Sequence, residues 1–465
     1  MLGIELDRKS ELQLWRQIYQ VLKEMMLSGH LKAGEALPST RELAKELNVS
    51  RNTVCEAYDL LIAEGFVISR QGAPTRVAQG LCIEPAEPPL SAKIKDRASV
   101  PISVSFRTGK PDLSLFPRFL WQQLMHKAYE ELTPEAFGYT GPQGLPCLRA
   151  EIAAWLFRIR GLKVSPDDIF ITAGATHGLH IIANILCRDG DSILMEDPCH
   201  TGMLGTFINR GCSIVPIPVD ADGIQTDYLI NCQSIGPIYV TPSHQFPLGG
   251  ILPASRRAAL IRFARENDLY IIEDDYDSEF RYGGEPVAPL YSMDPHRVIY
   301  VGTFSKAVFP ALRIGYVILP HPLQERWRNL RTHTDVQNPP FEQAALAEFL
   351  RTRKLDRHIR KMRKIYGRRR QVLLESLKEA FGSGWIAYGD SAGMHVAVEF
   401  PGMRFDGAFK KRCRQNGLYI TPAENHCIKK GLHTSKLLIG YGHLEPDAIR
   451  KGIFILSNTI KELLT

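Results

Sequence analysis

Apolar residues in the first part of the chain recur with the period of an α-helix, and turn residues separate the segments. The first stripe comprises Leu14, Ile18, Val21, Leu22 and Met25, which predicts a helix. Ser39, with Glu42 three residues later, forms a capping box that begins a second helix. Ser50 caps a third, whose inner face holds Val54, Ala57 and Leu61. Two short strands, 66–70 and 75–77, follow around a Gly-Ala-Pro turn.

Helices, a tight turn at Asn48 and a hairpin predict a winged helix-turn-helix DNA-binding domain over residues 1–78. The third helix would enter the major groove by its N-terminal residues, which are Ser50, Arg51, Asn52 and Thr53. Arginines elsewhere in the domain suit backbone phosphates, namely Arg41, Arg70 and Arg76. A small helical module that binds protein is the alternative that the pattern leaves open.

The stretch Leu37–Val54, together with Glu64-Gly-Phe-Val67, resembles the GntR family of bacterial regulators. The resemblance implies that DNA is contacted by Arg41, Ser50, Arg51, Asn52 and the wing glycine Gly72. The chain departs from the family at Cys55, where some members have a base-contacting arginine.

Hydrophobic patterning changes after a linker expected at 79–103, which contains four prolines and has little periodicity. From residue 104 onward, strand-like runs alternate with helical ones to about residue 320, which predicts an α/β domain with a mostly parallel sheet. The predicted strands are 168–172, 192–195, 237–240, 269–272 and 298–301. Residues from about 321 are helix-rich, with later strands near 395–399 and 436–439.

A motif with polar residues or glycine follows each of these strands, where open α/β sheets bind their ligands. The motifs are Gly174-Ala175-Thr176, 197–200, 242–249, 273–276 and the segment ending at Lys306. The first opens a helix, so its backbone N–H groups suit a phosphate. The hydroxyls of Thr303 and Ser305 and the guanidinium of Arg313 suit the same group. A lysine with a neutral amine can form a Schiff base, so the set indicates pyridoxal phosphate.

Three further residues suit the ring of that cofactor. Asp274 would keep a pyridine nitrogen protonated, Tyr276 could hydrogen-bond the phenolic oxygen and His200 could stack on the ring. Taken singly, each has a simpler interpretation: a solvated turn carboxylate, a loop histidine or, for Lys306, a surface lysine. Five motifs in the expected order favour the cofactor site.

From about residue 105 to the end, the chain closely resembles fold-type I, class I/II aminotransferases. The resemblance implies that Lys306 is the Schiff-base lysine, and that Tyr139 reaches the phosphate of the neighbouring subunit's cofactor. The other residues it implies at the cofactor are Asp274, Tyr276, His200, Gly174, Ala175, Thr176, Thr303, Ser305 and Arg313. Phe246 stands where the family usually has asparagine, and Leu438 where it usually has an arginine that clamps the substrate carboxylate. Another arginine, or Lys436, could substitute for that clamp.

A winged helix ahead of an aminotransferase-like domain over 104–465 is the layout of the MocR subfamily of GntR regulators. The resemblance implies a pyridoxal-phosphate-binding homodimer that binds double-stranded DNA under the control of an amine or vitamin B6 effector. The alternatives are an active aminotransferase with a tethering N-terminal domain and a scaffold without cofactor. The departures at Phe246 and Leu438 weigh against an aminotransferase with full turnover, but they leave Schiff-base exchange or a half-reaction open. The intact Lys306 weighs against a scaffold without cofactor.

Composition narrows these expectations only slightly. The 465 residues suffice for two or three domains. No apolar run reaches membrane-spanning length and no signal region is present, so a cytoplasmic location is expected. Nine scattered cysteines without a CxxC pair predict neither a disulfide framework nor a zinc site.

Net charge, +7, does not itself indicate DNA binding, because residues 1–78 hold ten basic and ten acidic residues. The excess is notable at 351–370, with eleven basic residues and one aspartate. The inward stripe of this segment is Leu355, Ile359, Met362 and Tyr366. A solvated helix face is the simpler interpretation, and a further surface for DNA phosphates is the sharper hypothesis.

Overall fold

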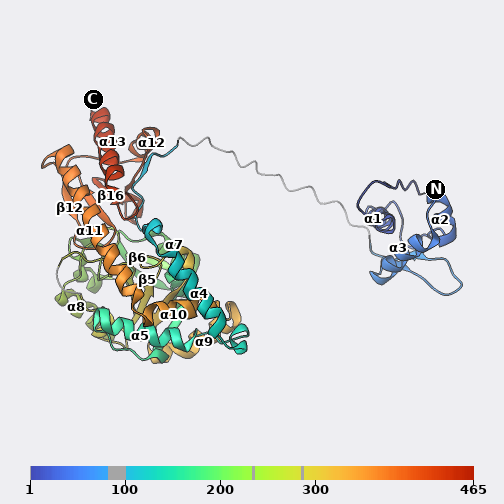
Figure 1. The fold of residues 1–465 in the computed structure, drawn as a ribbon, viewed down its shortest axis with the longest axis horizontal. Helices are drawn as coiled ribbons and strands as arrows, with labels where there is room; N and C mark the ends of the chain where they lie inside the picture. The colour runs from blue at the N-terminus through green and yellow to red at the C-terminus, as the bar shows by residue number, and fades with distance from the viewer. Residues whose placement is uncertain (1, 82–100, 233–235, 284–286, 465) are drawn as a thin grey trace. The chain divides into compact units, whose positions relative to one another are not determined.

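The computed structural model describes residues 2–81, 101–232, 236–283 and 287–464. It divides into two compact units, 1–98 and 99–465 (Figure 1). Most of the predicted linker, 82–100, lies outside the described residues. No helix in the described ranges is both long enough and apolar enough to cross a membrane.

The small unit contains three helices and a two-stranded antiparallel sheet. Its elements are α1 (Leu14–Leu27), α2 (Thr40–Leu47), α3 (Arg51–Ala63), β1 (Val67–Ile68) and β2 (Arg76–Val77). Both bonds of the predicted capping box are present: the Glu42 N–H donates to Ser39 Oγ at 3.2 Å, and the Ser39 N–H donates to the Glu42 carboxylate at 2.8 Å. Asn48 is left-handed, with φ 53°, where the chain turns from α2 into α3. Local sequence therefore places the second and third helices as predicted.

The core of the small unit is built from the predicted inner faces. Its fully enclosed side chains include Ile18, Leu22, Leu43, Val54, Ala57 and Leu61. The predicted strand at 66–70 is shorter than expected, because only Val67 and Ile68 pair with β2.

The large unit is organised around an eight-stranded sheet of order β4-β11-β10-β9-β8-β5-β6-β7. These strands are β4 (Ile169–Thr172), β5 (Ser192–Asp197), β6 (Ser213–Asp220), β7 (Gly223–Ile224), β8 (Ile238–Val240), β9 (Ile271–Asp275), β10 (Val298–Thr303) and β11 (Gly315–Ile318). The central pairs are parallel, and β11 lies antiparallel between β4 and β10. The predicted α/β fold with a mostly parallel sheet is confirmed.

Three strands extend beyond their predicted ends: β5 runs to Asp197 and β10 to Thr303, and β9 continues to Asp275 instead of ending at 272. Three acidic residues remain in this buried strand because each has partners. Glu273 accepts the backbone N–H groups of Leu290 and Tyr291, and the other two carboxylates bond to side chains of neighbouring elements. Polarity alone therefore misplaces the end of the strand.

Helices surround the sheet, and a smaller antiparallel sheet follows it. The helices are α4 (Arg118–Glu131), α5 (Pro146–Arg160), α6 (Ala175–Leu186), α7 (Thr201–Asn209), α8 (Ala254–Glu266), α9 (His321–Thr334), α10 (Pro340–Arg351), α11 (Lys354–Phe381), α12 (Gly407–Gln415) and α13 (Pro446–Leu464). The smaller sheet has the order β12-β13-β16-β15 (Ile386–Tyr388, His395–Glu399, Lys436–Gly440, Thr421–Pro422). A parallel pair joins β3 (Val104–Ser105) to β14 (Leu418–Tyr419). The long helix α11 runs beside α13 (Figure 1).

Candidate functional site

A cavity of about 260 Å³ lies at the carboxyl edge of the central sheet. Because parallel strands end on the same edge, segments far apart in the sequence meet there. Nine residues predicted at the cofactor line it: Ala175, Thr176, His200, Asp274, Tyr276, Thr303, Ser305, Lys306 and Arg313. The structure thus brings together side chains that the sequence placed at four different strand ends.

Lys306 reaches across the cavity to the segment before the first helix of the large unit. Its Nζ donates to the carbonyl oxygen of Gly109 at 2.6 Å. Burial lowers the pKa of the Lys306 amine, while Asp277 and Asp274 oppose that shift. A side chain at Gly109 would crowd the amine, since a Cβ there would lie 3.0 Å from Nζ and φ is +69°. Sequence reasoning missed Gly109, which no local signal links to a lysine 197 positions away.

Asp274 presents a free carboxylate oxygen at the cavity. One oxygen accepts the hydroxyl of Tyr239 at 2.7 Å, and the other, Oδ1, has no hydrogen-bond partner among the described residues. Burial raises the pKa of Asp274 to about 6. A buried acceptor without a donor is costly, so this oxygen suits a ligand N–H such as that of a protonated pyridine.

Tyr276 is held by a histidine that sequence reasoning had not singled out. The Tyr276 hydroxyl lies 3.1 Å from His244 Nδ1, which lies 3.0 Å from a carboxylate oxygen of Asp277. Burial opposes a charge on His244, but Asp277 outweighs it and raises the pKa of the imidazole. Burial also raises the pKa of Tyr276 well above its ordinary value, which keeps the phenol protonated. The predicted ring-oxygen partner is therefore a positioned hydroxyl.

The predicted phosphate-binding groups surround the N-terminus of α6. Gly174 is the N-cap residue and has no side chain to satisfy the first N–H groups of the helix. The Arg313 guanidinium lies against this turn, so that a Cβ on Gly174 would come within 2.9 Å of it. Thr303 and Ser305 are joined by their hydroxyls at 3.0 Å. A helix N-terminus, two hydroxyls and a guanidinium form a donor set that fits a phosphate.

His200 and Phe246 close another side of the cavity, with their ring centroids 5.0 Å apart. Burial lowers the pKa of His200, which favours the neutral ring. Phe246 lines the cavity and offers no hydrogen bond where the related enzymes usually have asparagine.

The expected carboxylate clamp has no substitute among the described residues that line the cavity, where Arg313 is the single arginine. Leu438 is fully buried and packs with Val219, Leu248 and Ala397. Lys436 forms an ion pair with Glu399 at 3.2 Å and does not line the cavity. Tyr139 is 89% exposed and lies outside the cavity lining as well.

The small unit exposes all but one of the residues predicted to contact DNA, and the exception, Thr53, is half-buried. Arg41, Arg51, Asn52, Arg70 and Gly72 are exposed. Ser50 caps α3 through the Thr53 N–H at 3.1 Å, and these two residues also bond through their hydroxyls. Arg76 is exposed too, although its guanidinium donates to the Gly34 carbonyl at 2.8 Å. Gly72 has φ +80° in the turn between β1 and β2, a conformation that glycine adopts without strain.

Two family models match the chain, one for each unit. Residues 14–77 match the gntR family of bacterial regulatory proteins, and residues 108–443 match aminotransferase class I and II. The probable rhizopine catabolism regulatory protein MocR of Rhizobium meliloti is 33% identical over 96% of this chain and 94% of its own. The pyridoxine biosynthesis transcriptional regulator PdxR of Corynebacterium glutamicum is 34% identical over 81% of each chain. Among solved structures, a kynurenine aminotransferase of Pyrococcus horikoshii superposes with a TM-score of 0.72 at 27% identity, covering 78% of this chain and 91% of that enzyme.

Proposed function

The chain belongs to the MocR group of gntR-family regulators, which join a helix-turn-helix to an aminotransferase class I and II domain, and from this premise we propose that it is a pyridoxal-phosphate-dependent transcription regulator. One observation carries the cofactor part of the proposal: a buried lysine amine, an unpartnered Asp274 oxygen and a phosphate-type donor set share one cavity. When bound, pyridoxal phosphate supplies an aldehyde that reacts reversibly with primary amines.

The residues of this chain would hold that group at its aldehyde carbon, ring nitrogen, ring oxygen, phosphate and ring face. Lys306 would bind the aldehyde carbon, and burial, which lowers the pKa of the amine, shifts it toward the neutral, nucleophilic form. Asp274 Oδ1 would accept the ring N–H, and Tyr276 would donate to the ring oxygen. The α6 N-terminus with Gly174, Ala175, Thr176, Thr303, Ser305 and Arg313 would hold the phosphate. His200 would cover the ring face, and Tyr139 would reach the site of a second copy.

DNA binding is assigned to residues 1–78. Ser50, Arg51, Asn52 and Thr53 would face base edges, and Arg41, Arg70, Gly72 and Arg76 the backbone. The large unit, as a homodimer, would alter the spacing of two such domains when an amine or vitamin B6 effector binds. The effector must bind the two arrangements with unequal affinity for this to regulate DNA binding.

The test is a gel shift with the DNA upstream of this protein's own gene, at physiological salt, with and without pyridoxal phosphate. A specific shift that responds to the cofactor, and loses that response in Lys306→Ala, supports the proposal. Absorbance of bound cofactor, measured on the same two proteins, separates cofactor loss from DNA effects. No specific shift, together with multiple-turnover transfer of amino groups, would support an aminotransferase instead.

The variant Arg51→Ala distinguishes recognition of specific bases from non-specific electrostatic binding to DNA. We expect the variant to lose about 1–3 kcal/mol of operator affinity and to relax discrimination at one base position. Arg16→Ala is the control, since Arg16 is an exposed arginine of α1 and not of α3. Equal losses on specific and unrelated DNA would contradict a base-reading role for Arg51.

A further inference from the structure

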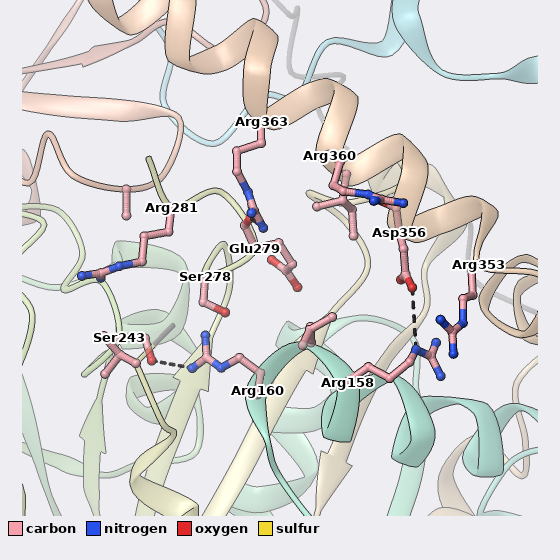
Figure 2. Close-up of a pocket in the computed structure, with 14 residues that line it drawn as sticks. Arg158, Arg160, Ser243, Ser278, Glu279, Arg281, Arg353, Asp356, Arg360 and Arg363 are labelled. Carbon is pink, nitrogen blue, oxygen red and sulfur yellow. Dashed lines mark hydrogen bonds and ion pairs between the residues drawn. The ribbon is translucent and has the colours of Figure 1, made fainter. Parts of the chain in front are cut away.

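A second cavity of the large unit, of about 640 Å³, is lined by six arginines and only two carboxylates. Figure 2 shows Arg363 extending from α11 toward Glu279, Arg360 lying along α11, and Arg158 and Arg160 on the opposite side at the end of α5. Arg281 and Arg353 complete the set, and Glu279 and Asp356 are the acids. No lining residue is shared with the cofactor cavity.

The buried guanidinium groups at the base of this cavity are incompletely satisfied. The Arg160 side chain is 5% exposed; it pairs with Asp275 at 3.1 Å and donates to Ser243 Oγ at 2.9 Å, but its buried Nε has no partner among the described residues. Arg158 Nε forms an ion pair with Asp356 at 3.7 Å, which is too long for a hydrogen bond, and the buried Nε and Nη2 have no hydrogen-bond partner among the described residues. Buried donors left unpaired cost free energy that a bound acceptor would recover.

The arginines nearer solvent have no carboxylate partner among the described residues. Arg363 donates to the backbone carbonyl of Glu279 at 2.8 Å, and Arg360 approaches the carbonyl of Asp356 at 3.4 Å. The buried Nε of Arg281 has no partner in the described ranges. Burial raises the pKa of Glu279 to about 8, which reduces the negative charge of the lining further. Like charges gathered at this density repel one another unless a counter-charge enters.

We propose that this arginine cavity binds a small polyanion, a molecule with two or more phosphate or carboxylate groups, at a site separate from the cofactor. The guanidinium groups converge from α5, α11 and the segment after β9, so they can meet anionic groups at several points. Guanidinium forks bind phosphate and carboxylate bidentately. The volume lies within the range of about 300–1,000 Å³ of small-molecule sites. The basic residues of 351–370 therefore fall into two groups. Some line this cavity, and others, such as Arg357 and Arg368, are exposed elsewhere on the same helix.

The test is calorimetric titration of the full-length protein, saturated with pyridoxal phosphate, in phosphate-free buffer. Inorganic pyrophosphate and citrate are the two probes, and they distinguish phosphate from carboxylate recognition. Arg360→Gln/Arg363→Gln removes two cavity arginines, and Arg357→Gln/Arg368→Gln removes two exposed arginines of the same helix with the same change of net charge. Arg353→Gln, at an exposed lining position, is a second variant if the double variant unfolds.

We expect saturable binding of at least one probe below about 1 mM. Affinity should fall about tenfold or more in the cavity variants and stay nearly unchanged in the matched control, since each charge-assisted hydrogen bond is worth that much. Absence of saturable binding, or equal losses in both double variants, would overturn the proposal. A third result would also overturn it. If the wild type binds no anion and light scattering shows that the cavity variant has a different oligomeric state, the cavity is a contact between copies of the chain.

Discussion

Asp274→Asn should stabilise the cofactor-free protein while weakening its binding of pyridoxal phosphate. Burial raises the pKa of Asp274 from 3.8 to about 6, so the folded state resists the charge that the unfolded chain carries at neutral pH. A pKa difference of this size lowers the free energy of unfolding of the wild type by about 3 kcal/mol at neutral pH. That net shift already includes the hydrogen bond that Tyr239 donates to the carboxylate. The expected gain is therefore about 3 kcal/mol at pH 7.5.

The gain has a defined pH dependence. A folded-state pKa above the unfolded one means that the wild type regains stability as pH falls through about 6 and has recovered it below 3.8. The advantage of Asp274→Asn should therefore shrink to about half by pH 5. Urea unfolding of the cofactor-free proteins, followed by tryptophan fluorescence at both pH values, measures it; Trp155 and Trp327 are buried reporters in the large unit.

The neighbouring carboxylate supplies the control. Asp275 is 6% exposed and Asp274 5%, so the two sites are equally buried. Asp275, however, is paired with Arg160 and accepts the Tyr300 hydroxyl. Asp275→Asn should lose about 3–5 kcal/mol, because it leaves a buried guanidinium without its counter-charge. An Asp274→Asn protein that is no more stable than wild type at pH 7.5, or whose advantage is the same at pH 5, would refute the reasoning.

Three further outcomes are expected. Ser39→Ala should destabilise the small unit by about 1 kcal/mol through loss of the α2 cap, measured by thermal unfolding; an unchanged melting curve would contradict it. Gly302→Ala should unfold the large unit at lower urea, because its Cβ would lie 2.2 Å from the Tyr316 ring, whereas Gly205→Ala in α7, whose Cβ meets nothing within 4 Å, is the control without a steric clash. Arg70→Ala should weaken binding to all DNA sequences alike and reduce the slope of log affinity against log salt by about 1; a slope equal to wild type would remove Arg70 from the phosphate contacts.

Features that depend only on residues close together in the sequence, such as helix caps, turns and helical stripes, were predicted from short sequence patterns. Ser39 and Glu42 cap a helix three residues apart, and Asn48 turns left-handed at the next junction. The outward basic residues of α11 and its inward stripe of Leu355 and Ile359 followed from helical period alone. The cofactor cavity was also predictable, because carboxyl ends of parallel strands meet wherever such a sheet forms.

Contacts between distant segments decided the rest. The Gly109 carbonyl that receives Lys306, the Tyr239 hydroxyl on Asp274 and the His244–Asp277 pair behind Tyr276 each join residues more than 30 positions apart. The arginine cavity joins residues about 200 positions apart, from the end of α5 to the start of α11.

The sequence by itself determined the two-part organisation, the α/β class and which residues are candidates for the cofactor site, because period, capping and strand-end position are properties of short stretches. Only the tertiary structure decided which oxygen of Asp274 is free, why Lys306 has a lowered pKa and where six arginines converge. Burial, unpaired donors and opposing charges are set by what packs against a residue, and that depends on segments that the chain brings together only on folding.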